Sequence, residues 1–154
     1  MNSKVPFIVS GLVLLLIYMV GSGLWVNTGD GWYRSLNAPS WQPPDWVFGT
    51  IWPYNFLMIG ISTFAVASYS PATKSLWLMS FGLSVVAALV WANQFYVSHR
   101  LLVASIALAC VPIFTSAMTR ILFANKPLLG LFFLPYQVWV TIATVLSFTY
   151  AAKN

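Results

Sequence analysis

The side chains in this sequence that could do chemistry are mostly aromatic rings and neutral amides. The aromatic residues within long apolar stretches are Trp52, Phe56, Trp91, Phe95 and Trp139, and the amides near them are Asn55, Asn93, Gln94 and Gln137. Aromatic walls bind flat, apolar ligands by stacking and burial, and a few amides fix the ligand's orientation. The pattern therefore indicates a site for a large, flat, mostly apolar ligand. Ordinary packing in a membrane-protein core is the alternative for any single tryptophan.

Acid–base and metal chemistry have little support. The only acids are Asp30 and Asp45, and no charged residue lies in the middle of a long apolar stretch. Neither a Ser/His/Asp set nor paired carboxylates can be assembled, which disfavours conventional hydrolysis and ion-coupled transport. Cys110 is a single cysteine without metal-ligand spacing, so no metal site is predicted. His99 could ligate a haem iron or pair with an acid, and a polar residue near the lipid headgroups is the alternative.

The composition places the chain in a lipid bilayer. Of 154 residues, 60% are hydrophobic and only 6% are charged, whereas about a quarter of residues in soluble proteins carry charge. The charge-free stretches are about 20 residues long, which is what a membrane-spanning helix needs. We therefore predict an all-α fold, in which residues 1–154 form a single transmembrane domain of five helices. The spans are expected at about 5–26, 46–68, 75–97, 101–119 and 127–150.

The positive charges predict an orientation in the membrane. The net charge is +5, but the basic residues lie singly near the ends of the predicted helices, which argues against nucleic acid as a partner. The predicted N-terminal side carries Lys4, Lys74, Arg120 and Lys126, and the opposite side carries Arg34, Arg100 and Lys153. The positive-inside rule therefore places the N terminus on the inner side, which is cytoplasmic in a bacterial inner membrane.

Residues 27–45 form the one long segment predicted outside the lipid, and we expect them to act as a lid. The segment is rich in tryptophan, tyrosine and proline, so it is stiffer than a passive linker. At about 1.5 Å per residue, Trp52 lies roughly 9 Å below the lid end of its helix, and Trp91 and Ala143 reach a similar depth. Trp139 lies one turn deeper than Ala143 on the same face. Three helices should therefore present a common level of aromatic side chains beneath the lid.

Two further patterns leave alternatives open. Ser84, Ala88 and Ala92 recur every four positions, which permits close helix contact either in a dimer or inside the bundle. Leu146, Tyr150 and Lys153 match a weak cholesterol-binding pattern. A tyrosine at the membrane interface, followed by a lysine that reaches the headgroups, explains the same residues.

Two segments resemble the TspO/MBR family, the translocator protein or peripheral-type benzodiazepine receptor. They are WYRSLNAPSWQPPDWVFGTIW at 32–52 and LPYQVWVTIATVL at 134–146. The resemblance implies a homodimer of five-helix bundles whose pocket binds porphyrins such as protoporphyrin IX and haem, benzodiazepine-type ligands and, in animals, sterols. It places Trp32, Tyr33 and Pro43 on the lid side, Trp52 on the second helix, and Trp139 and Ala143 on the fifth.

The ligand-binding residues expected on both grounds are Trp32, Tyr33, Pro43, Trp52, Phe56, Trp91, Phe95, Trp139 and Ala143. One departure from the family is Ala88, where members commonly carry an asparagine, and Asn93 or Gln94 is a candidate to compensate. The resemblance implies a membrane receptor for porphyrins that regulates or transports tetrapyrroles, without an obligatory cofactor, and Arg34 or Arg100 would meet the propionates. The alternative is a light- or oxygen-dependent porphyrin-degrading enzyme with Trp52 and Trp139 as catalytic candidates. A passive transporter and a structural adaptor are weaker alternatives.

Overall fold

The computed structural model describes residues 4–154, and this part of the chain is helical without strands. Its elements are α1 (Lys4–Trp25), α2 (Gly31–Ser35), α3 (Asp45–Val66), α4 (Pro71–Tyr96), α5 (Leu101–Asn125) and α6 (Pro127–Lys153). The prediction of an all-α fold is confirmed. The short helix α2 lies inside the predicted lid and was not predicted from the sequence.

Four of the described helices are long and apolar enough to cross a membrane, namely α1, α4, α5 and α6. Large apolar side chains such as Leu16, Ile113 and Leu128 point outward and are more than half exposed, as expected where lipid replaces water. The chain is therefore an integral, multi-pass membrane protein. Helix α3 has 22 residues but is not among these four, so length and composition support four of the five predicted spans.

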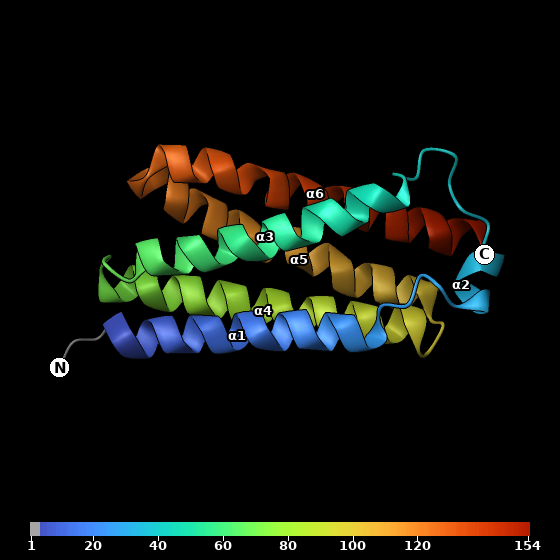
Figure 1. Cartoon of the computed structure of the whole chain (residues 1–154), viewed down its shortest axis with the longest axis horizontal. Coiled ribbons are helices and arrows are strands. Elements are labelled where there is room, and N and C mark those ends of the chain that lie inside the picture. Colours follow the sequence, from blue (N-terminus) through green and yellow to red (C-terminus); the bar gives the residue numbers. More distant parts are fainter. Residues whose placement is uncertain (1–3) are drawn as a thin grey trace.

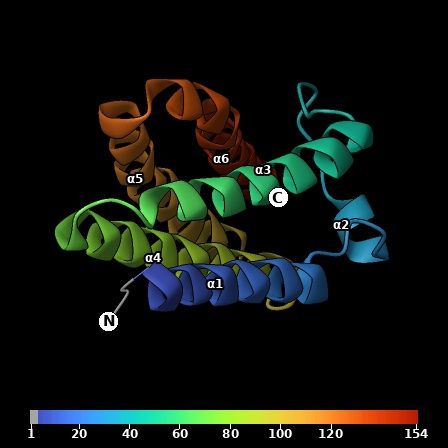
Figure 2. The ribbon, with the colours of Figure 1, turned by 60° about the vertical axis from the view of Figure 1, so that its left-hand side comes forward.

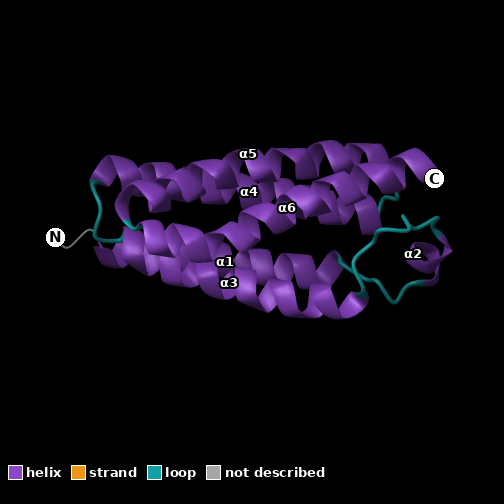
Figure 3. Cartoon of the chain, turned by 90° about the horizontal axis from the view of Figure 1, so that it is seen from above, coloured by secondary structure: helices purple, strands orange, loops and turns teal. Residues whose placement is uncertain are grey.

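The long helices lie side by side along one axis, with the lid at the end of the bundle that also holds the C terminus (Figures 1 and 3). Helices α4, α5 and α6 pack in sequence order, and α3 packs between α1 and α6 (Figure 2). Two glycines let α1 approach its neighbours. A Cβ atom on Gly11 would lie 2.4 Å from Thr63 of α3, and one on Gly21 would lie 2.6 Å from Leu89 of α4. Small residues at such crossings are typical of membrane helix packing.

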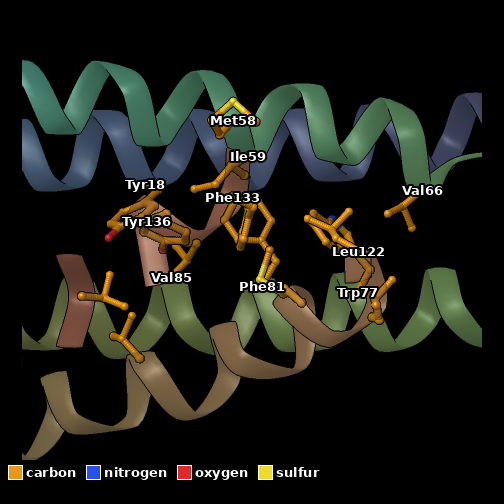
Figure 4. Close-up of a cluster of buried hydrophobic side chains, with 14 of the residues drawn as sticks. Tyr18, Met58, Ile59, Val66, Trp77, Phe81, Val85, Leu122, Phe133 and Tyr136 are labelled. Atoms are coloured by element: carbon orange, nitrogen blue, oxygen red, sulfur yellow. The ribbon is translucent and has the colours of Figure 1, made fainter. Parts of the chain in front are cut away.

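The half of the core that lies away from the lid is closely packed and rich in aromatic side chains. Trp77, Phe81 and Phe133 are 0% exposed and lie between helices α4 and α6 (Figure 4). The Trp77 indole N–H donates to the Thr63 hydroxyl at 3.3 Å, so this buried polar group is satisfied. The small residues Ser84, Ala88 and Ala92 are also buried within the single chain. They therefore serve helix contact inside the bundle, which was one of the two roles that the sequence left open, the other being contact in a dimer.

A polar seam joins α5 to α6 around Pro112. Because proline has no backbone N–H, Pro112 leaves the Leu108 carbonyl without its helical donor. The Thr144 hydroxyl donates to that carbonyl at 3.4 Å. The Gln137 side chain donates to the Pro112 carbonyl at 3.1 Å and accepts from Thr115 at 2.7 Å. These bonds hold the kinked helix against its neighbour, where unpaired groups would be costly.

The lid is tied to the end of α6. The Asn37 backbone N–H donates to the Asn154 side chain at 2.8 Å, and the Lys153 ammonium donates to the Ala38 carbonyl at 3.4 Å. The Tyr150 hydroxyl donates to Gln42 and lies 3.4 Å from the hydroxyl of Tyr33. More than a hundred residues separate the partners of each contact, so the lid depends on the tertiary fold.

A stacked pair of rings fixes the other side of the lid. Trp32 of α2 stacks on His99 of the α4–α5 turn, with ring centroids 3.7 Å apart and an interplanar angle of 10°. His99 has a φ of 57°, a left-handed conformation that histidine adopts more readily than most residues. The tight turn therefore presents the imidazole flat against the lid helix.

Replacing Gln137 by leucine should lower the free energy of unfolding by about 1 kcal/mol, the usual scale for an interhelical hydrogen bond in a membrane. Thermal unfolding in detergent would measure the loss. The matched control is Thr141→Val, because the exposed Thr141 hydroxyl bonds only to its own helix, at the Gln137 carbonyl. Equal stability of the wild type and Gln137→Leu would contradict the role of the seam.

Replacing Tyr150 by phenylalanine should loosen the lid because it removes the contacts to Gln42 and Tyr33. Arg34 is the one basic residue of the lid, so trypsin cleavage after Arg34 reports its opening. We expect cleavage to become several-fold faster in Tyr150→Phe. Tyr54→Phe is the control, since Tyr54 donates outside the lid, to the Phe132 carbonyl at 2.6 Å. Equal cleavage of the wild type and Tyr150→Phe would show that these contacts do not hold the lid.

Candidate functional site

A cavity of about 190 Å³ lies beneath the lid, between α3, α4 and α6. Most of its wall is aromatic or aliphatic. The residues that line it are Val26, Thr28, Tyr33, Phe48, Trp52, Trp91, Phe95, Tyr96, Trp139, Ala143, Leu146, Ser147 and Tyr150. Six of the nine predicted ligand-binding residues are in this wall: Tyr33, Trp52, Trp91, Phe95, Trp139 and Ala143.

Helical spacing brings these side chains to one level. On α3, Phe48 and Trp52 are four positions apart, and on α4 the same spacing relates Trp91 and Phe95. Residues four apart lie on one face of a helix, so each pair forms a continuous strip of wall. The depth arithmetic from the sequence therefore agrees with the structure: tryptophans of three different helices meet around one space.

The rings of the wall contact one another in edge-to-face and tilted geometries, which favours a rigid wall. Phe48 of α3 meets Trp139 of α6 with centroids 5.1 Å apart and planes at 83°. Tyr33 of the lid contacts Phe95 at 6.4 Å and Tyr150 at 5.9 Å. The Tyr33 contacts show that the lid contributes a ring to the cavity instead of only covering it.

The two tryptophans of the wall on α4 and α6 differ in the hydrogen bonding of their indole N–H groups. The Trp91 indole N–H donates to Ser147 at 3.2 Å, and Ser147 is 2.8 Å from the Ser105 hydroxyl. Trp139 is only 5% exposed, and its indole N–H has no hydrogen-bond partner. The Trp139 indole N–H is therefore a donor that no protein group uses, and it could orient a ligand that carries an acceptor.

A polar depression of about 330 Å³ adjoins the cavity on the lid side. Thr28, Tyr33 and Tyr150 line both spaces. Arg34 and Asp45 lie in the depression, whereas Arg100 lines neither space. Of the two arginines predicted to meet a ligand's carboxylates, only Arg34 is placed where it could do so.

Three of the nine predicted residues lie outside the cavity wall. Trp32 stacks on His99, and Pro43 belongs to the lid without lining the space. Phe56 lines instead an apolar groove between α3 and α1. Its ring packs 5.4 Å from Tyr18 and 5.5 Å from Trp52. Trp52 borders both the groove and the cavity.

The side chains considered as haem ligand or as replacement amides also lie elsewhere. His99 is stacked on Trp32, outside the cavity wall. The Gln94 side-chain amide donates to Asn93 at 3.3 Å, and neither residue lines the cavity.

Seven lining residues were not predicted as ligand-binding. They are Val26, Thr28, Phe48, Tyr96, Leu146, Ser147 and Tyr150. Two of them could have been predicted from helical spacing. Phe48 lies one turn before Trp52 and Tyr150 lies two turns after Ala143, so each lies on the same helix face as a predicted residue. Tyr150 drew attention only through the weak cholesterol pattern, but the structure gives it a contact with the lid.

Comparison with known proteins agrees with this architecture. The model of the TspO/MBR family matches residues 9–152. The chain is 29% identical to Protein CrtK of Rhodobacter capsulatus, over 90% of this chain and 91% of that protein. It is 27% identical to the tryptophan-rich sensory protein of Cereibacter sphaeroides, over 88% and 87% of the two chains. The human translocator protein is 26% identical, over 84% of this chain and 78% of its own. Since the family model covers nearly all of the sequence, the chain belongs to the TspO/MBR family.

Proposed function

We propose that this protein is a membrane receptor that binds porphyrins, such as protoporphyrin IX or haem, in the cavity beneath the lid. The observation that carries the proposal is the junction of an aromatic cavity with a polar depression that holds Arg34. A porphyrin has the same division, with a flat apolar ring and carboxylates at one edge. The ring would lie against Trp52, Trp91 and Trp139, and a carboxylate would face Arg34.

Binding a whole porphyrin requires the lid to move. The closed cavity of about 190 Å³ is smaller than the ~300 to 1,000 Å³ of typical ligand sites. Displacement of Tyr33 would join the cavity to the depression, because this residue lines both. Binding should therefore be coupled to lid opening, which gives a receptor a way to report its ligand.

We also propose that α3 crosses the membrane as a fifth span. It has 22 residues, about the length that a bilayer needs, and its one charged residue is Asp45 at its start. It packs between α1 and α6, which both meet the criteria for a span. With five spans, the lid would lie on the outer side and the N terminus on the inner, basic side. The homodimer implied by the family belongs to the same proposal.

The names of the relatives fit a sensory or transport role for a bound ligand. "Tryptophan-rich sensory protein" and "translocator protein" are said of those proteins, and they support the same class of function here. The light-driven alternative is favoured by one observation, since both candidate tryptophans, Trp52 and Trp139, line the same cavity. A new absorbing product that forms only with protein and light, and not with Trp52→Phe, would identify an enzyme.

Replacing Trp139 by alanine should raise the Kd for protoporphyrin IX about tenfold, because the wall loses a stacking ring and an indole donor. The measurement is a titration in the dark, followed by tryptophan quenching, with protein in lipid nanodiscs. Trp46→Ala is the control, since Trp46 is 71% exposed and lies outside the cavity wall. Non-saturating and equal quenching in all three proteins would indicate partitioning into lipid and contradict the proposal.

Replacing Arg34 by glutamine should weaken binding of protoporphyrin IX roughly two- to fivefold, the scale of a partly exposed ion pair. Binding of its dimethyl ester should not change, because the ester has no carboxylate. Arg100→Gln serves as the control, since Arg100 lies outside both spaces. If Arg34→Gln weakened the binding of protoporphyrin IX and of its dimethyl ester equally, Arg34 would not meet a carboxylate.

A further inference from the structure

A second apolar groove lies on the outer face of the bundle, between α3 and α6, and we call it the α3–α6 groove. It has a volume of about 460 Å³ and is lined by Trp46, Val47, Thr50, Ile51, Tyr54 and Pro135. Trp46, Thr50 and Pro135 are exposed, and none of the six residues lines the cavity beneath the lid. The groove therefore opens towards the lipid that surrounds the spans.

The α3–α6 groove and the cavity lie on the two sides of one helix contact. On α3, Val47 of the groove directly precedes Phe48 of the cavity wall. On α6, Pro135 of the groove lies one turn before Trp139 of the cavity wall. Both spaces therefore lie at about the same level against the same two helices. What separates them is the contact between α3 and α6.

One pair of rings closes this contact at the level of the cavity. Phe48 meets Trp139 edge to face, with ring centroids 5.1 Å apart, and it is the ring contact between α3 and α6 in the described part of the chain. Deeper in the same contact, the Tyr54 hydroxyl donates to the Phe132 carbonyl at 2.6 Å. Phe48 is only half-buried, so rotation of its ring away from Trp139 is the smallest movement that would join the groove to the cavity.

Both helices carry a proline just below this ring pair. Pro53 lies five positions beyond Phe48 on α3, and Pro135 lies four positions before Trp139 on α6. Both prolines are therefore about 6 to 8 Å deeper than the ring pair. Because proline has no N–H, each leaves the carbonyl four residues earlier without its helical donor. The two helices are thus weakened at one shared level, which lets their lid-side parts bend apart.

The other two approaches to the cavity are held by more contacts. The lid is bonded to α6 and stacked on His99. Between α1 and α3, Tyr18 is only 2% exposed, and its ring packs 5.9 Å from Trp52 and 5.4 Å from Phe56. Opening on that side would separate three packed rings, whereas opening between α3 and α6 separates one pair.

We propose that the contact between α3 and α6 is a lateral gate, through which an apolar aromatic ligand dissolved in the bilayer enters the cavity. The inference rests on the proposed function, because it adds a route of entry to the same cavity. An apolar molecule leaves water for the bilayer, so it reaches the α3–α6 groove without crossing the polar depression at the lid. The lid then has to move only for ligands that are larger than the closed cavity.

The test plugs the groove and measures how fast a small probe exchanges between bilayer and cavity. The probe is 2-fluoronaphthalene, and fluorine saturation-transfer NMR of the protein in nanodiscs gives its entry and exit rates. Thr50→Cys, in a Cys110→Ser background, is labelled with adamantyl methanethiosulfonate. Entry and exit should both slow about tenfold. The Kd should not change, because Thr50 lines the groove and not the cavity. Removal of the label with a reductant should restore both rates.

Two matched controls carry the same label at the other approaches. Leu57→Cys places it in the groove between α1 and α3, where Leu57 is 60% exposed, and Ala38→Cys places it in the polar depression. Neither label should slow exchange. Pro135→Ala, without a label, gives an independent measurement. It returns a backbone N–H to α6, so exchange should become several-fold slower at the same Kd.

Unchanged exchange in labelled Thr50→Cys or in Pro135→Ala would overturn the gate. A weaker Kd in labelled Thr50→Cys, or a larger slowing from the label at Leu57→Cys or Ala38→Cys, would overturn it as well. A parallel titration with protoporphyrin IX separates the gate from the proposed function. Saturable porphyrin binding with unchanged probe exchange would overturn the gate alone, whereas absence of saturable binding of both porphyrin and probe would overturn both.

Discussion

The structure depends on one constraint: inside a bilayer, a polar group has no water to bond with and must find a partner in the protein or in a ligand. The constraint makes the described spans helical, because a helix satisfies its own backbone. It also explains the seam around Pro112, where Gln137 bonds to the kinked helix and Thr144 bonds to the carbonyl that the proline leaves free. Each departure from a regular helix in this region is matched by a side chain of the neighbouring helix.

The same constraint applies to buried polar groups that have no hydrogen-bond partner in the protein. In the half of the core away from the lid, the buried Trp77 indole is bonded to Thr63. Of the buried groups without a hydrogen-bond partner, the Trp139 indole belongs to the cavity wall, whereas Asn55, Ser62 and Tyr136 lie elsewhere in the core. A bound molecule that carries an acceptor would give the Trp139 indole N–H the hydrogen bond that the protein does not supply. The lid, held by hydrogen bonds and one ring stack, closes that space without filling it.

The sequence predicted much of this arrangement because its signals were strong and local. Gaps between charges located the long helices to within a few residues at most ends, although α5 continues to Asn125, beyond the predicted residue 119. The rise per residue brought Trp52, Trp91 and Ala143 to one level. Both inferences need only helix geometry and the thickness of a bilayer.

Other features could not be predicted, for physical reasons. A membrane helix is apolar towards both lipid and core, so no stripe of polar residues indicates which face is buried. Phe56 and Phe48 are therefore equivalent in the sequence, although one lines the groove and the other the cavity. The bonds from the lid to Tyr150 and Asn154 join residues more than a hundred positions apart, and only the folded chain brings them together.

The central claim is that the ligand occupies the space between the lid and the aromatic level. Hydrogen–deuterium exchange of the protein in nanodiscs, with and without protoporphyrin IX in the dark, tests this claim most directly. The account predicts that the ligand changes exchange in residues 27–45 and at the lid ends of α3 and α6, and leaves the α5–α6 turn unchanged. Unchanged exchange in the lid, with protection confined to the lipid-facing surface or the opposite end of the bundle, would contradict it.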